Sequence, residues 1–214
     1  MSLNGQIVLK ERPRGEAKAS HFEYREAPIP SPQAGEVVVK HHFLSLDPYM
    51  RGRMDESKSY AAPQNLGEVM IGGTVGEVVA SQSPLLKVGD RVTMCPDVVC
   101  GHCYECKHVM GYVWCENSVA YGNSLSSALA PHLFGGMAEQ MYLRPDTFVY
   151  KVPSGLSARV AVLAELMACT ASLDKVKEFS SYAMEGFNSA DTVVVIGAGP
   201  LGLLHIAKAD MMGA

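Results

Sequence analysis

Four closely spaced cysteines constrain this chain more than any other feature of its sequence. Cys100, Cys103, Cys106 and Cys115 lie within the stretch CGHCYECKHVMGYVWC and are four of the six cysteines in the chain. The intervals of two, two and eight residues allow one short loop to bring all four thiols together, because closing a short loop costs little chain entropy. Zinc favours four thiolates in a tetrahedron, so the spacing predicts a zinc-binding loop.

A zinc ion with four protein ligands has no open position for water or substrate, which is typical of a structural site. Two alternatives are a redox-active CxxC pair and a chance clustering of cysteines. His102 and His108 lie inside the loop, and we expect both to be exposed rather than ligating. Cys95 and Cys169 stand apart from the cluster, and we expect each to be a small apolar core residue.

The composition excludes several classes of protein. The chain has 214 residues and a net charge of -4, so it offers no basic surface to nucleic acid or to an anionic membrane. No apolar run approaches the roughly 20 residues of a membrane span. The N-terminus lacks the apolar segment of a signal peptide. Cysteines in a cytosolic protein bind metal or act in catalysis more often than they form disulfides. We therefore expect a reduced, cytoplasmic protein.

The chain up to about residue 153 has the pattern of a β-rich, barrel-like domain. Glu36–Lys40 is rich in β-branched residues and predicts a strand. Met70–Val79 is strand-like but interrupted by glycines, which indicates a bulge or a close backbone approach. Val88–Val92 predicts a turn that leads into a strand, and Met137–Val152 is a further apolar and aromatic stretch.

The pattern changes after Pro153. Residues 158–179 have apolar residues at helical spacing and predict one or two helices. Residues 191–196 form a continuous apolar run, as expected of a parallel strand buried on both faces. A glycine-rich stretch follows, and Leu203–Met212 resumes a helical pattern.

The glycine-rich stretch predicts a dinucleotide-binding turn. Gly197, Gly199 and Gly202, with Pro200 and Leu201 between them, follow a β run and open a helical segment, which is the context that a GxGxxG motif requires. Such a turn lets a pyrophosphate approach the free N–H groups of a helix N-terminus. The alternative is a tight strand-to-helix turn without a ligand. The acidic residue that contacts the ribose lies about 20 residues further on, beyond Ala214, so the choice between NAD and NADP stays open.

Residues 191–214 are shorter than the roughly 30 residues of one βαβ unit. We therefore expect that the chain is a fragment of a longer protein, or that the remainder was lost or removed.

The motifs together resemble those of the medium-chain dehydrogenase/reductase superfamily, and two parts of the chain resemble different branches of it. Residues from about 96 to 214 are similar to the zinc-containing alcohol dehydrogenases, in the cysteine loop, in residues 132–139 and in residues 191–202. Residues 4 to about 92 are similar to the zinc-independent prostaglandin reductase and leukotriene 12-hydroxydehydrogenase branch, in LSLDPYMRGRM, in KSY and in the segments 66–70 and 72–79. That branch reduces activated C=C bonds of enones with NADPH.

The resemblance implies a fold and a domain organisation. Residues 1–155 would form a β-rich GroES-like catalytic domain with a structural-zinc lobe at 96–118. Residues 156–214 would form connecting helices and the first β-α unit of an incomplete α/β Rossmann dinucleotide-binding domain. The cofactors implied are a structural zinc ion, held by the four loop cysteines, and NAD or NADP.

Departures from the alcohol dehydrogenase pattern imply that a catalytic zinc is absent. The position of a ligating Cys holds Leu44, and the positions of a His and a Glu hold Gly72 and Gly73. Glu165 matches a remaining acidic position, but a catalytic zinc needs about three protein ligands.

The resemblance also implies roles for three other residues. Tyr49 and Arg51 would line the nicotinamide and substrate cleft, and Thr170 would contact the cofactor. The alternatives are a half-buried packing residue for Tyr49, a surface charge for Arg51 and a place on a helix surface for Thr170.

We thus expect an NAD(P)(H)-dependent oxidoreductase that moves hydride to or from a small carbonyl, alcohol or enone. The alternative is a catalytically inactive, zinc-stapled fragment or chimera. The expected partner is a small-molecule substrate; the oligomeric state stays open, with a homo-oligomer as the common case.

Overall fold

The computed structural model describes residues 3–59, 61–108, 114–174 and 192–214. The chain divides into two compact units, Met1–Val162 and Leu163–Ala214, and each is described by itself. Among the described residues, no helix has both the length and the apolar character needed to cross a membrane.

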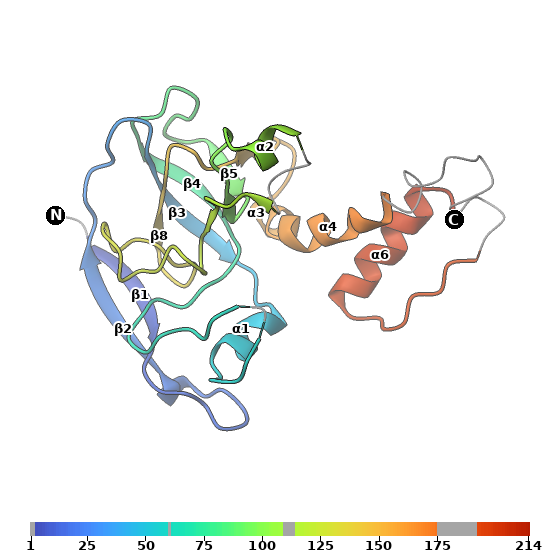
Figure 1. Cartoon of the computed structure of the whole chain (residues 1–214), viewed down its shortest axis with the longest axis horizontal. Coiled ribbons are helices and arrows are strands. Elements are labelled where there is room, and N and C mark those ends of the chain that lie inside the picture. Colours follow the sequence, from blue (N-terminus) through green and yellow to red (C-terminus); the bar gives the residue numbers. More distant parts are fainter. Residues whose placement is uncertain (1–2, 60, 109–113, 175–191) are drawn as a thin grey trace. The chain divides into compact units, whose positions relative to one another are not determined.

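The first unit is built on a five-stranded antiparallel sheet with the strand order β8-β3-β4-β5-β9 (Figure 1). The strands are β3 (Val37–Leu44), β4 (Thr74–Ser81), β5 (Arg91–Met94), β8 (Gln140–Leu143) and β9 (Val149–Lys151). The β-rich prediction is confirmed, and β3 extends the predicted strand to Leu44. A turn at Val88 and Gly89 leads into β5, as the sequence predicts.

The glycine-bearing strand β4 approaches its neighbour closely, as predicted. The register of the β3–β4 pair shifts between His41 and Phe43, which marks a bulge. At Gly76, a Cβ atom would lie 2.3 Å from the carbonyl oxygen of Lys40. No side chain fits there, so Gly76 lets the two strands lie together. The strand begins at Thr74 rather than Met70.

An N-terminal hairpin attaches to the edge of this sheet. Strands β1 (Leu3–Leu9) and β2 (Phe22–Pro28) pair along their whole lengths, and the 3-10 helix η1 (Ala19–His21) precedes β2. The side-chain amide of Asn4 in β1 donates to the carbonyl of Gln140 and accepts from its N–H, at 2.9 and 2.8 Å. A side chain thus continues the hydrogen-bond ladder beyond β8.

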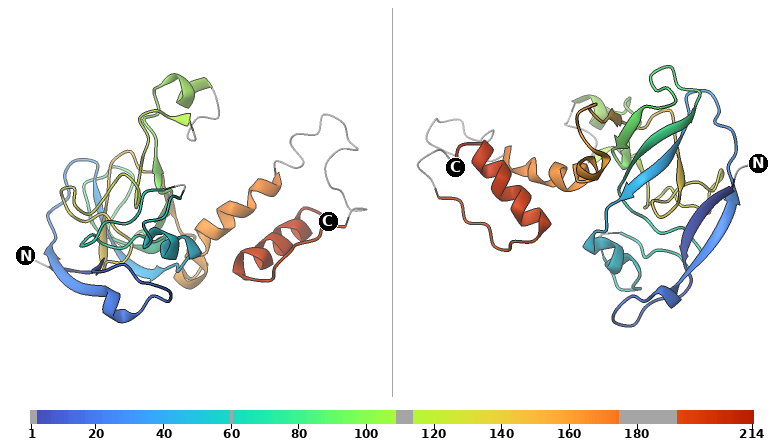
Figure 2. Two further views of the ribbon diagram at one scale, coloured as in Figure 1. Left: turned by 60° about the horizontal axis from the view of Figure 1, so that its bottom comes forward. Right: turned by 180° about the vertical axis from the view of Figure 1, so that it is seen from behind.

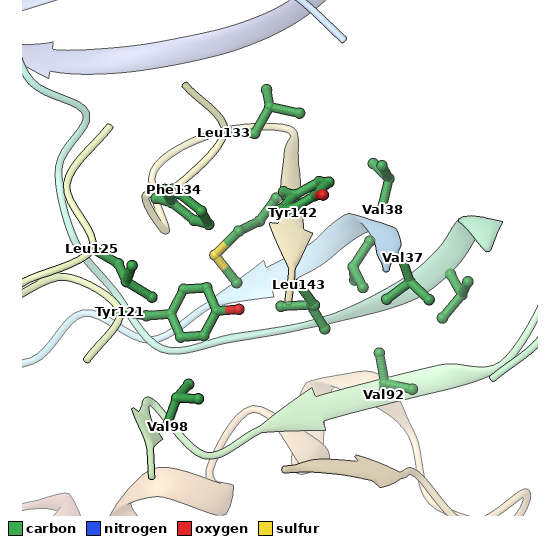
Figure 3. Close-up of a cluster of buried hydrophobic side chains, with 13 residues drawn as sticks. Val37, Val38, Val92, Val98, Tyr121, Leu125, Leu133, Phe134, Tyr142 and Leu143 are labelled. Carbon is green, nitrogen blue, oxygen red and sulfur yellow. The ribbon is translucent and has the colours of Figure 1, made fainter. Parts of the chain in front are cut away.

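The main core lies between the sheet and the loops that cover it (Figure 3). Valines of β3, β4 and β5 meet three aromatic rings, of which Phe134 lies edge-on to both Tyr121 and Tyr142, with ring centres 5.8 and 6.0 Å apart. A second cluster joins Leu9 to Met54 and Met70. This unit also contains the short helices α1 (Pro48–Arg53) and α3 (Ala158–Ala161).

The cysteine loop forms a lobe that stands away from the sheet, as the left view of Figure 2 shows. The lobe starts and ends at the two-residue strands β6 (Asp97–Val98) and β7 (Val119–Ala120), which pair with each other. Between them lies the helix α2 (Tyr104–His108), which buries none of its residues.

The second unit contains the helices α4 (Ala164–Thr170) and α6 (Pro200–Met211). The predicted helices are confirmed as far as the described residues extend, which excludes 175–179. Lys208 Nζ lies 2.7 Å from Asp174 Oδ1 and joins α6 to the segment that follows α4.

Two sequence predictions in this unit are wrong. Residues 192–196 are not a strand, and Val194 and Ile196 are 78% and 99% exposed; Asp191 lies outside the described residues. A strand needs a neighbour for its backbone N–H and C=O groups, and no described segment pairs with this one. Cys169 is exposed on α4 and is not a core residue.

Candidate functional site

The structure brings Cys100, Cys103, Cys106 and Cys115 together, with all four Sγ atoms within 4.8 Å of one another. The β6–β7 pair holds the two ends of the loop side by side, so that the N–H of Cys100 points to Cys115 Sγ at 3.5 Å. The turn of α2 carries Cys106 back over the first two cysteines. No other group of three or more His, Cys, Asp or Glu side chains within the described residues could hold a metal ion.

The distances between the sulfur atoms fit tetrahedral zinc. Zn–S bonds of about 2.3 Å place the corners of a tetrahedron about 3.8 Å apart. Cys115 Sγ lies 3.6 Å from Cys100 Sγ and 3.9 Å from Cys103 Sγ, and Cys100 Sγ lies 4.0 Å from Cys106 Sγ. These three separations are compatible with a tetrahedral zinc site.

The protonation of the thiols also favours a cation. The backbone N–H groups of His102 and Cys103 point to Cys100 Sγ and lower the pKa of that thiol to about 6. Burial, together with the neighbouring thiols of Cys103 and Cys115, raises the pKa of Cys106 to about 12. Ionising one thiol therefore disfavours ionising the next, and a bound divalent cation would remove that repulsion.

The two histidines of the loop lie outside this cluster. His102 and His108 are both exposed, as predicted. The ring of His102 contacts the carbonyl oxygen of Cys100 through Nδ1 at 2.7 Å, and the ring of His108 lies against Tyr104, with centres 4.7 Å apart. The four thiols alone form the candidate metal centre.

The three glycines of the nucleotide motif each have a distinct geometry. Gly197 has a φ of 105°, which only glycine adopts readily. Gly199 precedes α6, and a Cβ atom there would meet nothing within 4 Å. At Gly202, a Cβ atom would lie 2.1 Å from the carbonyl oxygen of Gly197. These match the tight turn, the open approach for a pyrophosphate and the close packing that the motif requires. Pro200 and Leu201 form the first turn of α6.

The positions that would hold a catalytic zinc lie next to each other but carry no metal ligands. A Cβ atom on Gly72 would lie 2.6 Å from Leu44 Cδ1 and 2.8 Å from Met50 Cε. Leu44 and Met50 therefore fill the space into which a side chain at position 72 would extend. The N–H of Ser45 donates to the carbonyl of Gly73 at 2.9 Å and holds the two segments together. Glu165 belongs to the second unit and is exposed.

Asp47, next to this apolar contact, is buried. Its Oδ1 accepts a hydrogen bond of 2.9 Å from the Ser45 hydroxyl, whereas Oδ2 has no hydrogen-bond partner among the described residues. A buried carboxylate oxygen without a partner is uncommon in folded proteins, and sequence patterns gave no sign of it.

The structure places the predicted catalytic residues on α1. Tyr49 is half-buried. Arg51 uses all three guanidinium nitrogens: Nε and Nη2 donate to the carbonyl of Gly15 at 3.1 and 2.7 Å, Nη2 also to that of Pro13, and Nη1 donates to Asp55. Arg51 therefore ties α1 to the loop that precedes β2. Thr170 of the second unit is buried, and its hydroxyl donates to the carbonyl of Met167 at 2.7 Å.

Sequence reasoning missed a small polar recess in the first unit. It has a volume of about 100 Å³ and lies between the end of α1, residues 62–71, residues 122–127 and residues 134–135. The buried guanidinium of Arg53 donates to the Asn123 side chain and to the carbonyl of Gly122 on its wall. The one sequence signal for it was a second arginine two residues after Arg51.

Parts of this chain are similar to known proteins. Residues 5–98 match the family described as the N-terminal domain of oxidoreductase. The NADPH-dependent curcumin reductase of Escherichia coli is 44% identical over 89 residues, which cover 42% of this chain and 26% of that protein. The L-threonine 3-dehydrogenase of Thermococcus kodakarensis is 28% identical over 100% of this chain and 55% of its own length.

A solved structure has the same fold. The alcohol dehydrogenase of Thermotoga maritima superposes with a TM-score of 0.76 at 26% identity, over 100% of this chain and 56% of that one. The β-rich first unit is therefore the N-terminal domain of a medium-chain dehydrogenase/reductase fold.

These matches support the medium-chain dehydrogenase/reductase superfamily for this chain. The matched part covers 26% of the length of the E. coli reductase and 55% of the length of the T. kodakarensis dehydrogenase.

Proposed function

We propose that this chain is part of an oxidoreductase that transfers hydride between a nicotinamide cofactor and a small carbonyl or enone, without a catalytic zinc ion. The bound cofactor would supply the hydride. The residues of this chain would bind the pyrophosphate at Gly197, Gly199 and Gly202 and would position the substrate from α1. The name of the E. coli relative, an NADPH-dependent reductase, supports NADPH as the cofactor.

One observation supports a reductase rather than a zinc alcohol dehydrogenase. Leu44 and Met50 pack onto Gly72, where the alcohol dehydrogenases that this chain resembles supply metal ligands. A zinc ion polarises an alcohol oxygen only if protein ligands hold it there, and Leu44 and Gly72 offer no ligand atom. An enone needs no such metal if a donor stabilises the developing enolate. Tyr49 is our candidate for that donor, and Arg51 would hold α1 in place.

We also propose that the four loop cysteines hold a structural zinc ion. The separations of 3.6 to 4.0 Å between sulfur atoms support it, as does the lack of buried residues in α2. The described part of the lobe, residues 96–108 and 114–118, buries few side chains, and a bound metal would supply stability there.

Cofactor binding by the glycine turn is tested with a pair of glycine variants. Gly199→Val adds a side chain where nothing lies within 4 Å, so the variant is expected to fold but to block the approach of a pyrophosphate. Gly155→Val is the matched control, because its Cβ position is also open. We expect NADPH fluorescence to be enhanced by the native chain and the control, and not by Gly199→Val.

No response of the native chain to millimolar NADPH would contradict cofactor binding by this chain. It would favour the alternative, an inactive zinc-stapled fragment. Metal content is tested separately by elemental analysis, which should find about one zinc ion per chain. A second equivalent of zinc would contradict the absence of a catalytic metal.

A further inference from the structure

The described part of the cysteine lobe buries few side chains. Within its described part, residues 96–108 and 114–118, only Val98 and Cys115 are buried, and Tyr104 and Trp114 are 69% and 66% exposed. The β6–β7 pair contributes two residues from each strand. A change in the chemical state of the four sulfur atoms is therefore expected to change the conformation of the lobe.

The cysteines differ in their access to solvent. Cys100, Cys103 and Cys106 are half-buried, whereas Cys115 is 5% exposed. A small oxidant in solution therefore reaches one of the first three sulfur atoms before it reaches Cys115. A sulfenic acid formed on an accessible cysteine condenses with a neighbouring thiol to give a disulfide.

Among the three pairs with sulfur atoms within 4.0 Å given above, Cys100 and Cys115 need the least movement. Their sulfur atoms are 3.6 Å apart, against 3.9 and 4.0 Å for the other two measured pairs. The N–H of Cys100 already points to Cys115 Sγ, and the β6–β7 pair holds both segments in place. A disulfide needs S–S of about 2.05 Å, so the two sulfur atoms must approach by roughly 1.5 Å.

We propose that the lobe is an oxidation site, at which a peroxide converts Cys100 and Cys115 into a disulfide and Cys103 and Cys106 into a second one, with release of the zinc ion. This inference extends the proposal of a structural zinc site. Only the release of zinc depends on that proposal. The Cys100–Cys115 pairing rests on the 3.6 Å separation of their sulfur atoms, and Cys103 and Cys106 are the two thiols that then remain.

The chemistry balances with peroxide as the oxidant. A thiolate attacks one peroxide oxygen, the O–O bond breaks, and the departing oxygen leaves as water after taking up protons. The neighbouring thiolate then attacks the sulfenic sulfur, the S–O bond breaks, and a second water leaves. For the tetrathiolate as a whole, two peroxides and four protons yield two disulfides, four waters and free Zn²⁺.

The test uses the intact chain, loaded with zinc and treated with hydrogen peroxide. Released zinc is followed with a chromophoric chelator, and disulfides are mapped by mass spectrometry of unreduced peptides. Cys169→Ser is the matched control, because Cys169 is exposed and lies outside the cluster. We expect the native chain and the control to release zinc equally and to give a linked Cys100–Cys115 peptide. A thiol reductant and fresh zinc should restore the metal content.

Cys115→Ser removes the cysteine that resolves the sulfenic acid. Because Cys106 Sγ lies 4.0 Å from Cys100 Sγ, we expect a linked Cys100–Cys106 peptide in place of the Cys100–Cys115 peptide. If this variant does not fold, the disulfide map of the native chain still decides the pairing.

Three results would overturn the proposal. They are, in the native chain, a pairing of Cys100 with Cys103 or Cys106 instead of Cys115, oxidation to sulfinic acid without any disulfide, and oxidation of Cys169 while zinc stays bound. If elemental analysis finds no zinc before treatment, the zinc proposal fails by itself, and the disulfide map still tests the pairing.

Discussion

At the scale of single residues, His41 in β3 couples the stability of the first unit to pH. Nδ1 of its ring donates to the carbonyl of Ala138 at 2.7 Å, and Nε2 is buried. Burial lowers the pKa of His41 from 6.5 to about 4, against a smaller opposing effect of the Ala138 and Gly136 carbonyls. Between these two pH values the unfolded chain binds a proton and the folded chain does not, so stability decreases as the pH is lowered.

We predict that this coupling removes about 2 kcal/mol of unfolding free energy between pH 7 and pH 5. Urea denaturation at the two pH values measures it. His41→Asn keeps a donor for the Ala138 carbonyl but does not titrate, so its pH dependence should be weaker. The neighbouring His42 is exposed, and His42→Asn should retain the native dependence. Equal slopes for the native chain and His41→Asn would refute the assignment.

Gly76 and Gly52 form a second residue-scale comparison. Gly76→Ala places a Cβ atom 2.3 Å from the Lys40 carbonyl, whereas at Gly52, inside α1, a Cβ atom would meet nothing within 4 Å. We expect Gly76→Ala to lose about 2 kcal/mol or more of stability. Gly52→Ala should gain about 0.5–1 kcal/mol, because alanine is the better helix former. Denaturant midpoints of both variants decide the matter, and a neutral Gly76→Ala would contradict the close strand approach.

At the scale of elements, the attachment of β1 to the sheet depends on Asn4. Its side chain makes two hydrogen bonds to the backbone of Gln140 and is 0% exposed. Asn4→Ala would leave a buried N–H and C=O unsatisfied, which costs about 1–3 kcal/mol for each group. We predict a loss of stability of that order and faster hydrogen exchange at the Gln140 N–H. Asn65→Ala, at an exposed position, should stay within about 0.5 kcal/mol of the native chain; matching losses in both variants would exclude this role.

Sequence patterns predict an element best where the element carries its own signal. The β-branched run of β3, the turn before β5 and the apolar spacing of α6 are local, and the structure contains all three. The attachment of β1 carries no such signal, because an asparagine that replaces a strand neighbour looks like any polar residue. Residues 192–196 show the opposite case: they have the composition of a buried strand but no pairing partner in the described part of the chain.

In the candidate site, too, local features could be predicted from the sequence and long-range contacts could not. The cysteine spacing and the GxGxxG motif could be read directly, because a loop of four thiols and a glycine turn are local devices. The packing of Leu44 and Met50 onto Gly72 joins distant segments, so the sequence indicated missing ligands but not what fills their space. The contacts of Arg51 with the loop before β2, and the recess beside Arg53, depend on how segments fold against each other, which no periodicity reports.

At the scale of the whole molecule, the two units of the chain differ in how many of their described residues are buried. Both apolar clusters lie in the first unit, Met1–Val162. In the second unit, Ala209 and Thr170 are the buried residues among those described. We therefore expect the first unit to contain the amides that exchange most slowly with solvent.

The exposed run TVVVI at residues 192–196 has a practical consequence for the chain in solution. All five side chains are β-branched and none is charged, a composition that favours intermolecular β-stacking. We predict that light scattering and thioflavin T fluorescence rise with protein concentration. Val194→Lys should suppress the rise, whereas Val160→Lys, at another exposed valine, should not. If so, the time for which a concentrated sample stays free of aggregates depends on these five residues and not on the thermal stability of the folded first unit.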